Sequence, residues 1–274
     1  MIARRHALGL AALAAMPVAR AVAQTPEVIP LWQDRPQGDE DVGSHGQIRD
    51  VTASRLIVHR PAKPNGMAVI VMAGGGYRVI EQGRESGPAS AWLQSLGVTA
   101  YELIYRLPGP GIPASDTFAD GLRAVQIVRS NTPGGRVGLL GFSSGAHLAG
   151  MTAATVPVDF AGLIYPVLTM MPPWNHTQAF KVILGDHGDE AQYKAFSVDR
   201  QVRPGWPPVF LAQAADDPVS PIENSLLMFA ALRRADILPE MHIFRAGGHG
   251  WGLGAPGSEV AAWPALFARW AGMD

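Results

Sequence analysis

The stretch VGLLGFSSGA, residues 137–146, joins a short apolar run to a serine pair that lies between two glycines. The apolar run predicts a buried strand, and the residues that follow predict a helix. A serine on a sharp strand-to-helix turn stands exposed, and the flanking glycines let other backbone pass close to it. The free N–H groups at the helix start favour negative charge at the same point. The stretch therefore predicts a nucleophile, Ser143, and a plain glycine–serine turn is the alternative.

Apolar runs and helical patterns alternate on both sides of this stretch. Short apolar runs predict strands over residues 55–59, 68–73, 99–105, 137–141, 160–165, 208–214 and 240–244. Helical spacing predicts helices over residues 87–96, 118–129, 146–154, 222–235 and 258–271. Continuous apolar strands separated by helices are typical of a parallel sheet that is covered on both faces. We therefore expect an α/β fold with a mostly parallel central sheet and helices on both faces.

Two segments depart from this alternation. Residues 24–53 are polar and rich in Pro, Gly and Asp, and we expect an extended lead-in over the surface. Residues 166–206 lie between two predicted strands and are irregular in pattern. Such an excursion is a lid or binding loop in some proteins and surface padding in others, and both interpretations stay open. No linker divides residues 24–274, which we interpret as one domain.

A second glycine-rich turn, AGGGY at residues 73–77, ends the strand predicted over 68–73. Three consecutive glycines let backbone N–H groups point into a cleft, where an acyl-transfer enzyme needs donors for its oxyanion. One such donor lowers the barrier by about 3 kcal/mol. We expect the N–H groups of Gly75 or Gly76, together with that of Ser144, to form an oxyanion hole. A phosphate loop is disfavoured, because neither Gly-x-Gly-x-x-Gly nor Gly-Lys-Ser/Thr is present.

Candidate acid and base residues follow two later strands. Asp216 and Asp217 come directly after the strand predicted over 208–214, and His249 lies in a glycine-rich loop after residue 244. A histidine there can reach across a cleft and exchange a proton near neutral pH. Either aspartate could orient the imidazole, and the other would be a turn or cap residue. The order serine, acid, histidine is that of α/β-hydrolase triads, and it disfavours serine proteases with other chain orders.

The remaining histidines are weaker candidates for the general base. His147 lies four residues after Ser143, on the helix that leads away from the turn, and we interpret it as a packing residue. His242 lies inside a predicted strand, and His176 and His187 lie in the irregular excursion, where they could contact a substrate. His249 alone follows the acid at the end of a later strand.

The composition of the 274-residue chain narrows the range of functions. Hydrophobic residues make up 47% and charged residues 16%, which allows a large core. The net charge is −1 and no run of Lys and Arg follows the N-terminus, so we expect no nucleic-acid partner. The lack of cysteine excludes disulfides, thiolate metal sites and cysteine catalysis. The sequence contains no His-x-x-x-His pair, which would be typical of a metal hydrolase. We therefore expect neither a metal nor a cofactor.

The first 23 residues have the features of an export signal. Arg4 and Arg5 precede an Ala/Leu-rich run, and Ala21-Val22-Ala23 fits a cleavage site after Ala23. The apolar run is shorter than the roughly 20 residues that span a bilayer. We expect an exported protein, periplasmic or extracellular, without a membrane partner. The general secretory and twin-arginine routes both stay open.

Taken together, these motifs resemble the acetyl-esterase branch of α/β-hydrolases, related to acetylxylan esterases and to hormone-sensitive-lipase-like and kynurenine-formamidase-like enzymes. The matching pieces are PLW (30–32), GGGY (74–77), YRL (105–107), Asp120 with RAV (123–125), GFSSGAHL (141–148), YPV (165–167), DDPV (216–219) and GHGWG (248–252). Many relatives carry His or Pro where this chain has Ala73, which leaves the anchoring of the glycine turn open. Relatives usually show Asp-x-x-Val-Pro in the acid segment, and this pattern favours Asp217 over Asp216.

The resemblance implies a serine carboxylesterase with Ser143 as nucleophile, His249 as general base and Asp217 as the residue that orients it. An exported member of this branch would remove acetyl groups from xylan or xylo-oligosaccharides. An amidase or peptidase of the same fold, a lipase and a non-catalytic binding protein are the alternatives.

Four aromatic residues could offer faces for stacking on sugar rings near the cleft. They are Tyr77, Trp174, Trp206 and Trp251. Core or rim packing is the equally weighted alternative for each of them.

Overall fold

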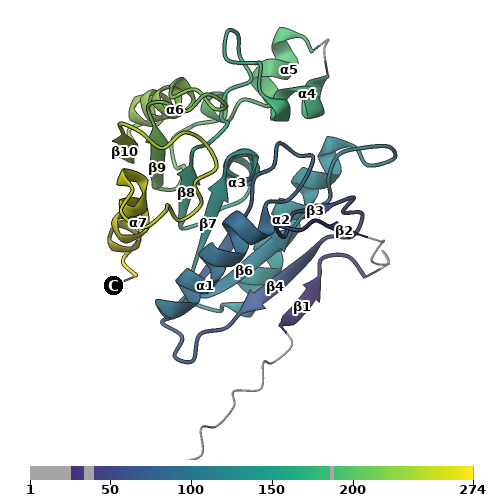
Figure 1. Ribbon diagram of the computed structural model, residues 1–274, viewed down its shortest axis with the longest axis vertical. Coiled ribbons are helices and arrows are strands. Elements are labelled where there is room, and N and C mark those ends of the chain that lie inside the picture. The colour runs from purple at the N-terminus through teal and green to yellow at the C-terminus, as the bar shows by residue number, and fades with distance from the viewer. Residues whose placement is uncertain (1–25, 34–39, 186–187, 274) are drawn as a thin grey trace, which may run out of the picture.

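The computed structural model describes residues 26–33, 40–185 and 188–273. Its main element is an eight-stranded sheet in the order β1-β4-β6-β5-β7-β8-β9-β10 (Figure 1). The strands are β1 (Glu27–Pro30), β4 (Arg55–His59), β5 (Met67–Met72), β6 (Thr99–Ile104), β7 (Arg136–Phe142), β8 (Phe160–Ile164), β9 (Val209–Ala214) and β10 (Glu240–Phe244). The pairs β1–β4 and β4–β6 are antiparallel, and the other neighbours are parallel. The predicted mostly parallel sheet is confirmed.

Helices cover both faces of this sheet, as predicted. They are α1 (Gly87–Ser95), α2 (Ala114–Asn131), α3 (Ser144–Thr155), α4 (Gln178–Leu184), α5 (Glu190–Ala195), α6 (Glu223–Arg234) and α7 (Trp263–Ala271). Side chains of α1 and α7 belong to one apolar cluster, and side chains of α2, α3 and α6 belong to the other. The short turns are a π-helical η1 (Gln82–Ser86) and the 3-10 turns η2 (Val198–Arg200) and η3 (Glu259–Ala262).

Strand β5 shows why a continuous apolar run indicates a strand between two helix layers. All six of its residues, MAVIVM, are buried. Successive side chains of a strand point to opposite faces, so Ala68, Ile70 and Met72 enter one cluster and the alternate residues enter the other. A strand with only one buried face would need a polar residue at every second position.

The N-terminal segment is more ordered than its composition predicts. Instead of an extended lead-in alone, β1 adds an edge strand beside β4, and β2 (Asp41–Val42) pairs with β3 (Ile48–Arg49). Leu31, Ile48 and Val51 are buried in the core. An edge strand of four residues pairs on one side only, so it carries too little periodicity to be distinguished from a polar loop.

The irregular excursion over residues 166–206 contains α4, α5 and η2. Figure 1 shows α4 and α5 together at one end of the sheet, at the top of the view. Helices of seven and six residues span about two turns, which is too short for a periodic pattern to indicate them. The C-terminal helix also begins later than predicted, because η3 precedes α7 and Pro264 occupies the first turn of α7, where proline is favoured.

The turns that follow four strands of the parallel part of the sheet come together at one edge of the sheet. They follow β5, β7, β9 and β10, and parallel strands bring their carboxyl ends to the same edge. Within the described residues, none of the helices combines the length and hydropathy that a membrane-crossing segment needs. The predicted export signal, residues 1–23, lies outside the described residues.

Candidate active site

Ser143 lies on the turn between β7 and α3 in a strained backbone conformation. Its φ is +51° and its ψ is −119°, a region that non-glycine residues rarely adopt and that is typical of functional sites. The backbone N–H of Ser143 donates to the Ile164 carbonyl at 2.9 Å, which ties the turn to β8. Gly145 packs directly on the end of β5, where a Cβ would lie 2.2 Å from the Met72 carbonyl oxygen. The second glycine of the motif therefore lets the serine turn and the glycine turn touch.

His249 connects Ser143 to Asp217. Its Nε2 lies 2.8 Å from Ser143 Oγ, and its Nδ1 lies 2.7 Å from Asp217 Oδ2. Because the carboxylate accepts a hydrogen bond from Nδ1–H, the proton of the neutral ring stays on Nδ1, and Nε2 is free to accept the proton of the serine hydroxyl. The backbone N–H groups of Val219 and Ser220 donate to the other carboxylate oxygen, at 2.8 and 2.9 Å. The structure therefore brings the three predicted triad residues into one hydrogen-bonded chain.

Asp216 has a different place from Asp217. Its Oδ1 accepts the backbone N–H groups of Gly247 and Gly248, at 2.9 and 2.8 Å, so it holds the start of the loop that carries His249. These hydrogen bonds lower the pKa of the Asp216 carboxyl from its ordinary value. Asp217 thus contacts the imidazole and Asp216 contacts the loop that carries it, which agrees with the preference for Asp217.

The glycine turn after β5 presents free N–H groups beside Ser143. Gly75 and Gly76 have φ values of +120° and +62°. Within the described part of the chain, the N–H groups of Gly75, Gly76 and Ser144 donate to no other residue. The turn is anchored without the His or Pro of relatives: Tyr105 Oη donates to the Ala73 carbonyl oxygen at 2.7 Å, and Gly74 N–H donates to Glu85 Oε2 at 2.5 Å. Three donors are therefore available for an oxyanion.

Replacing Gly75 by alanine is expected to lower kcat for ester hydrolysis at least about a hundredfold, because a misplaced oxyanion donor has an effect of this size. A Cβ at Gly75 would lie 2.1 Å from the Val79 carbonyl oxygen, so the turn has to move. Gly66→Ala is the matched control, since Gly66 also has a positive φ but has no atom within 4 Å of its Cβ position. We expect that control to lose stability and to keep its kcat. Equal kcat in Gly75→Ala and the wild type would contradict this position for the oxyanion hole.

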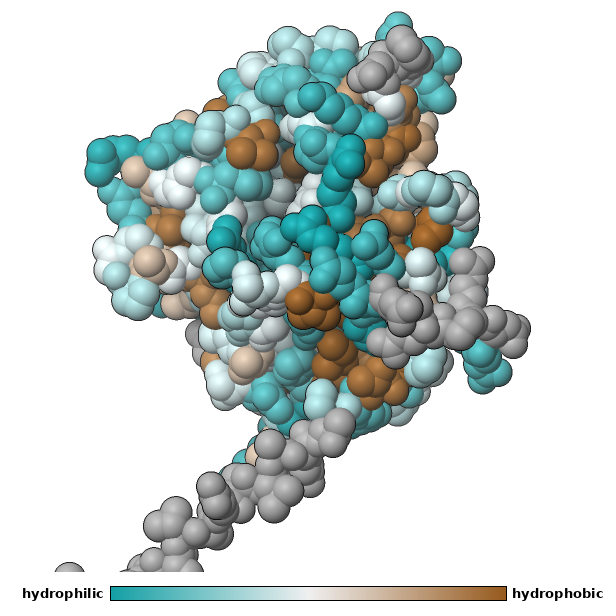
Figure 2. Space-filling view, turned by 45° about the vertical axis from the view of Figure 1, so that its right-hand side comes forward, coloured by the Kyte–Doolittle hydropathy of each residue, from teal (hydrophilic) through white to brown (hydrophobic). Residues whose placement is uncertain are grey.

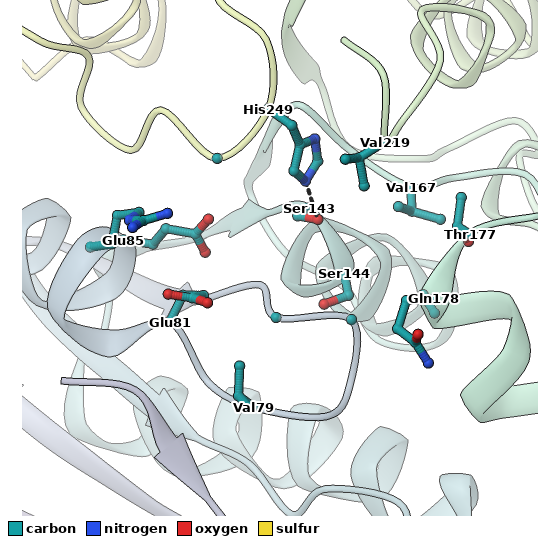
Figure 3. A pocket seen from close by; sticks show the side chains of 15 residues that line it. Val79, Glu81, Glu85, Ser143, Ser144, Val167, Thr177, Gln178, Val219 and His249 are labelled. Atoms are coloured by element: carbon teal, nitrogen blue, oxygen red, sulfur yellow. Dashed lines mark hydrogen bonds between the residues drawn. The ribbon is translucent and has the colours of Figure 1, made fainter. Parts of the chain in front are cut away.

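A pocket of about 360 Å³ opens in front of Ser143. Figure 3 shows Glu81 and Glu85 on one side of the serine and Val167, Val219, Thr177 and Gln178 on the other. One wall therefore carries two carboxyl groups, and the other mixes apolar and uncharged polar side chains. Residues of α4 reach this pocket, so part of the excursion over 166–206 is a wall of the site and not surface padding alone.

The four aromatic residues considered as sugar-stacking residues lie outside the pocket lining. The prediction that Tyr77 stacks on a sugar ring is wrong, because only 1% of this residue is exposed and its hydroxyl lies 2.8 Å from His147 Nδ1. Trp251 packs its ring on Tyr165, with a centroid distance of 4.5 Å, and Trp174 is half-buried and also does not line the pocket. Trp206 is buried in the core. An aromatic beside a glycine turn can point to either side, so the sequence could not distinguish these positions.

His147 is a packing residue, as predicted. Its Nε2 lies 2.7 Å from the Phe196 carbonyl oxygen, so Nε2 carries the proton and Nδ1 accepts the Tyr77 hydroxyl. Burial lowers the pKa of His147 to about 4, which keeps the ring neutral at ordinary pH. It does not take part in the serine–histidine chain. Among the described residues, no cluster of His, Asp and Glu could hold a metal ion.

Sequence reasoning missed Glu85, which is buried in the pocket wall. Burial raises its pKa from the ordinary value of 4.5 to about 7, although hydrogen bonds from Gly74 and Tyr165 oppose this shift. No local motif marks this glutamate, because its two hydrogen-bond partners lie 11 and 80 residues away in the chain.

The raised pKa of Glu85 makes stability depend on pH. The folded protein binds this proton more tightly than the unfolded chain, so its contribution to stability is present below about pH 4.5 and is lost as the pH rises to about 7. Glu85→Gln cannot titrate. We therefore expect the free energy of unfolding of the wild type, relative to this variant, to fall between about pH 4.5 and about pH 7 in urea titrations. Parallel pH profiles for the two proteins would contradict a buried, titrating Glu85.

Comparison with known proteins places the chain among hydrolases. A model described as the prolyl oligopeptidase family matches residues 89–273, which include all three residues of the serine–histidine–aspartate chain. An acetylxylan esterase of Xylanibacter ruminicola is 30% identical over 219 residues, which cover 76% of this chain and 45% of the relative. The endo-1,4-beta-xylanase B of Butyrivibrio fibrisolvens is 29% identical over 242 residues, covering 80% of this chain and 37% of that protein. The chain thus spans less than half the length of these curated relatives.

A solved structure is similar over almost its whole length. It is an acetyl ester-xyloside bifunctional hydrolase from Caldicellulosiruptor lactoaceticus, with a TM-score of 0.75 and 29% identity. The match covers 91% of this chain and 97% of that one. A carboxylesterase from Lactobacillus plantarum, at 20% identity and a TM-score of 0.69, shares the fold.

Proposed function

Because the chain belongs to the prolyl oligopeptidase family of α/β-hydrolases, we propose that it is a serine carboxylesterase that removes acetyl groups from xylan or xylo-oligosaccharides. One observation carries the chemical part of this proposal: Ser143, His249 and Asp217 form a continuous hydrogen-bonded chain that ends at a pocket beside three free backbone N–H groups. Similarity to an acetylxylan esterase and to an acetyl ester-xyloside hydrolase supports the substrate class.

The reaction follows from this geometry as a two-step acyl transfer. His249 takes the proton of Ser143 Oγ while the oxygen attacks the ester carbonyl, and the N–H groups of Gly75, Gly76 and Ser144 stabilise the oxyanion. The imidazolium then protonates the leaving alcohol, and the acyl group stays on the serine. Water, deprotonated by His249 in turn, attacks the acyl-enzyme and releases the acid and the free serine. The carboxylate of Asp217 stabilises the charged imidazole in both steps.

The pocket walls fit a small acyl group on a hydroxyl-rich alcohol. Glu81 and Glu85 lie on one side of Ser143 (Figure 3). Arg84 also lines the pocket, and such charged groups can hydrogen-bond to sugar hydroxyls. The opposite side carries Val167 and Val219. The apolar side chains that line the pocket are Val79, Val167, Ala179 and Val219. They offer little apolar surface for a long acyl chain, so the lining favours an acetyl esterase over a lipase.

The substrate class is tested by comparing p-nitrophenyl acetate, butyrate and octanoate with acetylated xylo-oligosaccharides and a peptide p-nitroanilide. We expect kcat/KM to fall at least about tenfold from acetate to octanoate, since a few methylene groups without a matching pocket have an effect of this order. We also expect acetate release from the xylo-oligosaccharides. A preference for octanoate would indicate a lipase, and activity on the anilide alone would indicate a peptidase.

We propose in addition that the protein is exported and acts outside the cytoplasm. The basic residues Arg4 and Arg5, the apolar run and the Ala21-Val22-Ala23 site support this proposal. N-terminal sequencing of the protein recovered from the periplasm or medium should read Gln24 as its first residue. Recovery of the intact chain in the cytoplasm alone would contradict it.

A further inference from the structure

Glu85 links the two loops that carry the oxyanion donors and the general base. Its Oε2 accepts the N–H of Gly74 at 2.5 Å, next to the oxyanion glycines. Its Oε1 accepts the hydroxyl of Tyr165 at 2.9 Å. That hydroxyl in turn accepts the backbone N–H of Gly252, at 3.1 Å, in the loop that bears His249. One carboxylate is thus joined to both loops by three hydrogen bonds.

Packing between the same segments supports this link. The Tyr165 ring lies edge-on to the His249 ring, with 5.0 Å between their centroids. Gly252 lies against the turn η1 that carries Glu85, because a Cβ at Gly252 would lie 2.5 Å from the Arg84 carbonyl oxygen. The turn η1 is π-helical, a rare conformation that is frequent at functional sites.

We propose that Glu85, in its ionised form, is a positioning residue that holds the oxyanion turn and the histidine loop in their relative places. The proposal rests on the esterase function proposed above. Glu85 acts through Gly74 and Tyr165, so its loss changes the alignment of the reacting groups more than the binding of substrate. A small misalignment of catalytic groups is sufficient to lower a rate by one to two orders of magnitude.

The protonation state of Glu85 decides whether this network is complete. A carboxylate accepts both hydrogen bonds, and Tyr165 then donates to Glu85 and accepts from Gly252. A protonated carboxyl has to donate from one oxygen, so the donor that faces this oxygen, either Gly74 N–H or the Tyr165 hydroxyl, is opposed by an O–H group. Burial raises the pKa of Glu85 to about 7, so this change falls near neutral pH. The titratable and charged groups around it are Glu81 and Arg84 on its own side, Tyr105 after β6, Tyr165 after β8 and His249 after β10.

The test compares Glu85→Gln with the wild type on p-nitrophenyl acetate across the pH range. Glutamine has the same shape and imitates the protonated carboxyl. We expect kcat above neutral pH to fall about tenfold to a hundredfold, with KM changed less than about threefold. We also expect the acid limb of kcat/KM to be steeper in the wild type, where both Glu85 and the general base must be deprotonated, and to reflect one group in the variant.

Two further variants separate positioning from a purely structural role. Glu102→Gln is the matched control: this glutamate is equally buried and binds Ser86 Oγ at 2.6 Å, but it does not line the pocket. We expect that control to lose thermal stability and keep the wild-type kcat and acid limb. Tyr165→Phe removes only the hydroxyl link, and we expect its kcat to fall in the same direction, with a non-additive effect in the double variant.

The outcomes are distinguishable. A wild-type chain without any Ser143-dependent ester hydrolysis would refute the esterase function itself. An active wild type whose kcat and acid limb are unchanged in Glu85→Gln would overturn the positioning role alone. If Glu85→Gln does not fold, an unchanged kcat and pH profile in Tyr165→Phe would overturn it, and a lower kcat with a shallower acid limb would support it.

Discussion

Ser143→Ala is expected to lower kcat/KM for p-nitrophenyl acetate at least about a thousandfold, because the chain then lacks the atom that forms the acyl-enzyme. Ser143 is buried, with 7% of the residue exposed, and within the described residues its hydroxyl is hydrogen-bonded to His249 Nε2. The substitution removes that contact and leaves the turn in place. We therefore expect the thermal midpoint to stay close to that of the wild type, so that the lost activity does not reflect unfolding.

A matched control for this variant is Ser90→Ala. Ser90 is a buried serine on α1 whose hydroxyl has no hydrogen-bond partner within the described residues. We expect this control to keep the wild-type kcat/KM. Wild-type rates in Ser143→Ala, with a normal fold, would show that another group attacks the ester.

Asp217→Asn is expected to lower kcat by about a thousandfold to ten thousandfold. The asparagine keeps the shape of the side chain and can still accept the N–H groups of Val219 and Ser220. Its amide, however, can present a donor to His249 Nδ1, which would place the imidazole proton on Nε2 and prevent it from accepting the proton of Ser143. The measurement is kcat for p-nitrophenyl acetate together with the thermal midpoint.

The neighbouring substitution Asp216→Asn makes this prediction specific. Its side-chain carbonyl can still accept the N–H groups of Gly247 and Gly248, so the histidine loop keeps its position. We expect kcat to fall less than about tenfold, because a neutral acceptor weakens a hydrogen bond without removing it. A larger loss in Asp216→Asn than in Asp217→Asn would contradict the geometry and would make Asp216 the acid.

The strands of the central sheet could be predicted from the sequence because both of their faces are buried. Strand β5 and strand β7 read as continuous apolar runs, so their positions were correct to within one residue. The edge strand β1 and the helices α4 and α5 were missed for the opposite reason. Each is short and partly exposed, so tertiary contacts stabilise it without leaving a periodic pattern.

The candidate triad could be located because each of its members lies in the turn or loop that follows a parallel strand. Ser143, Asp217 and His249 each follow such a strand, and topology brings their turns together. Their catalytic roles remain predictions. Glu85 could not be located, because its role depends on a network with Gly74 and Tyr165 that exists only in the folded chain.

The predicted sugar-stacking residues show the limit of arguments from residue type. Tyr77 and Trp251 lie in the expected loops, but their rings pack against His147 and Tyr165 and not in the pocket. Whether a side chain in a glycine-rich loop points inward or outward depends on φ and ψ values that the sequence leaves open.

The acyl-enzyme on Ser143 can be detected by intact-mass and peptide-mapping measurements on the wild-type chain, quenched in acid during turnover of p-nitrophenyl acetate. A serine nucleophile predicts a mass increase of one acetyl group, located on the peptide that contains Ser143 and absent from Ser143→Ala. Steady hydrolysis without any acetyl group on Ser143, at an equal rate in Ser143→Ala, would contradict the serine nucleophile and with it the proposed esterase mechanism.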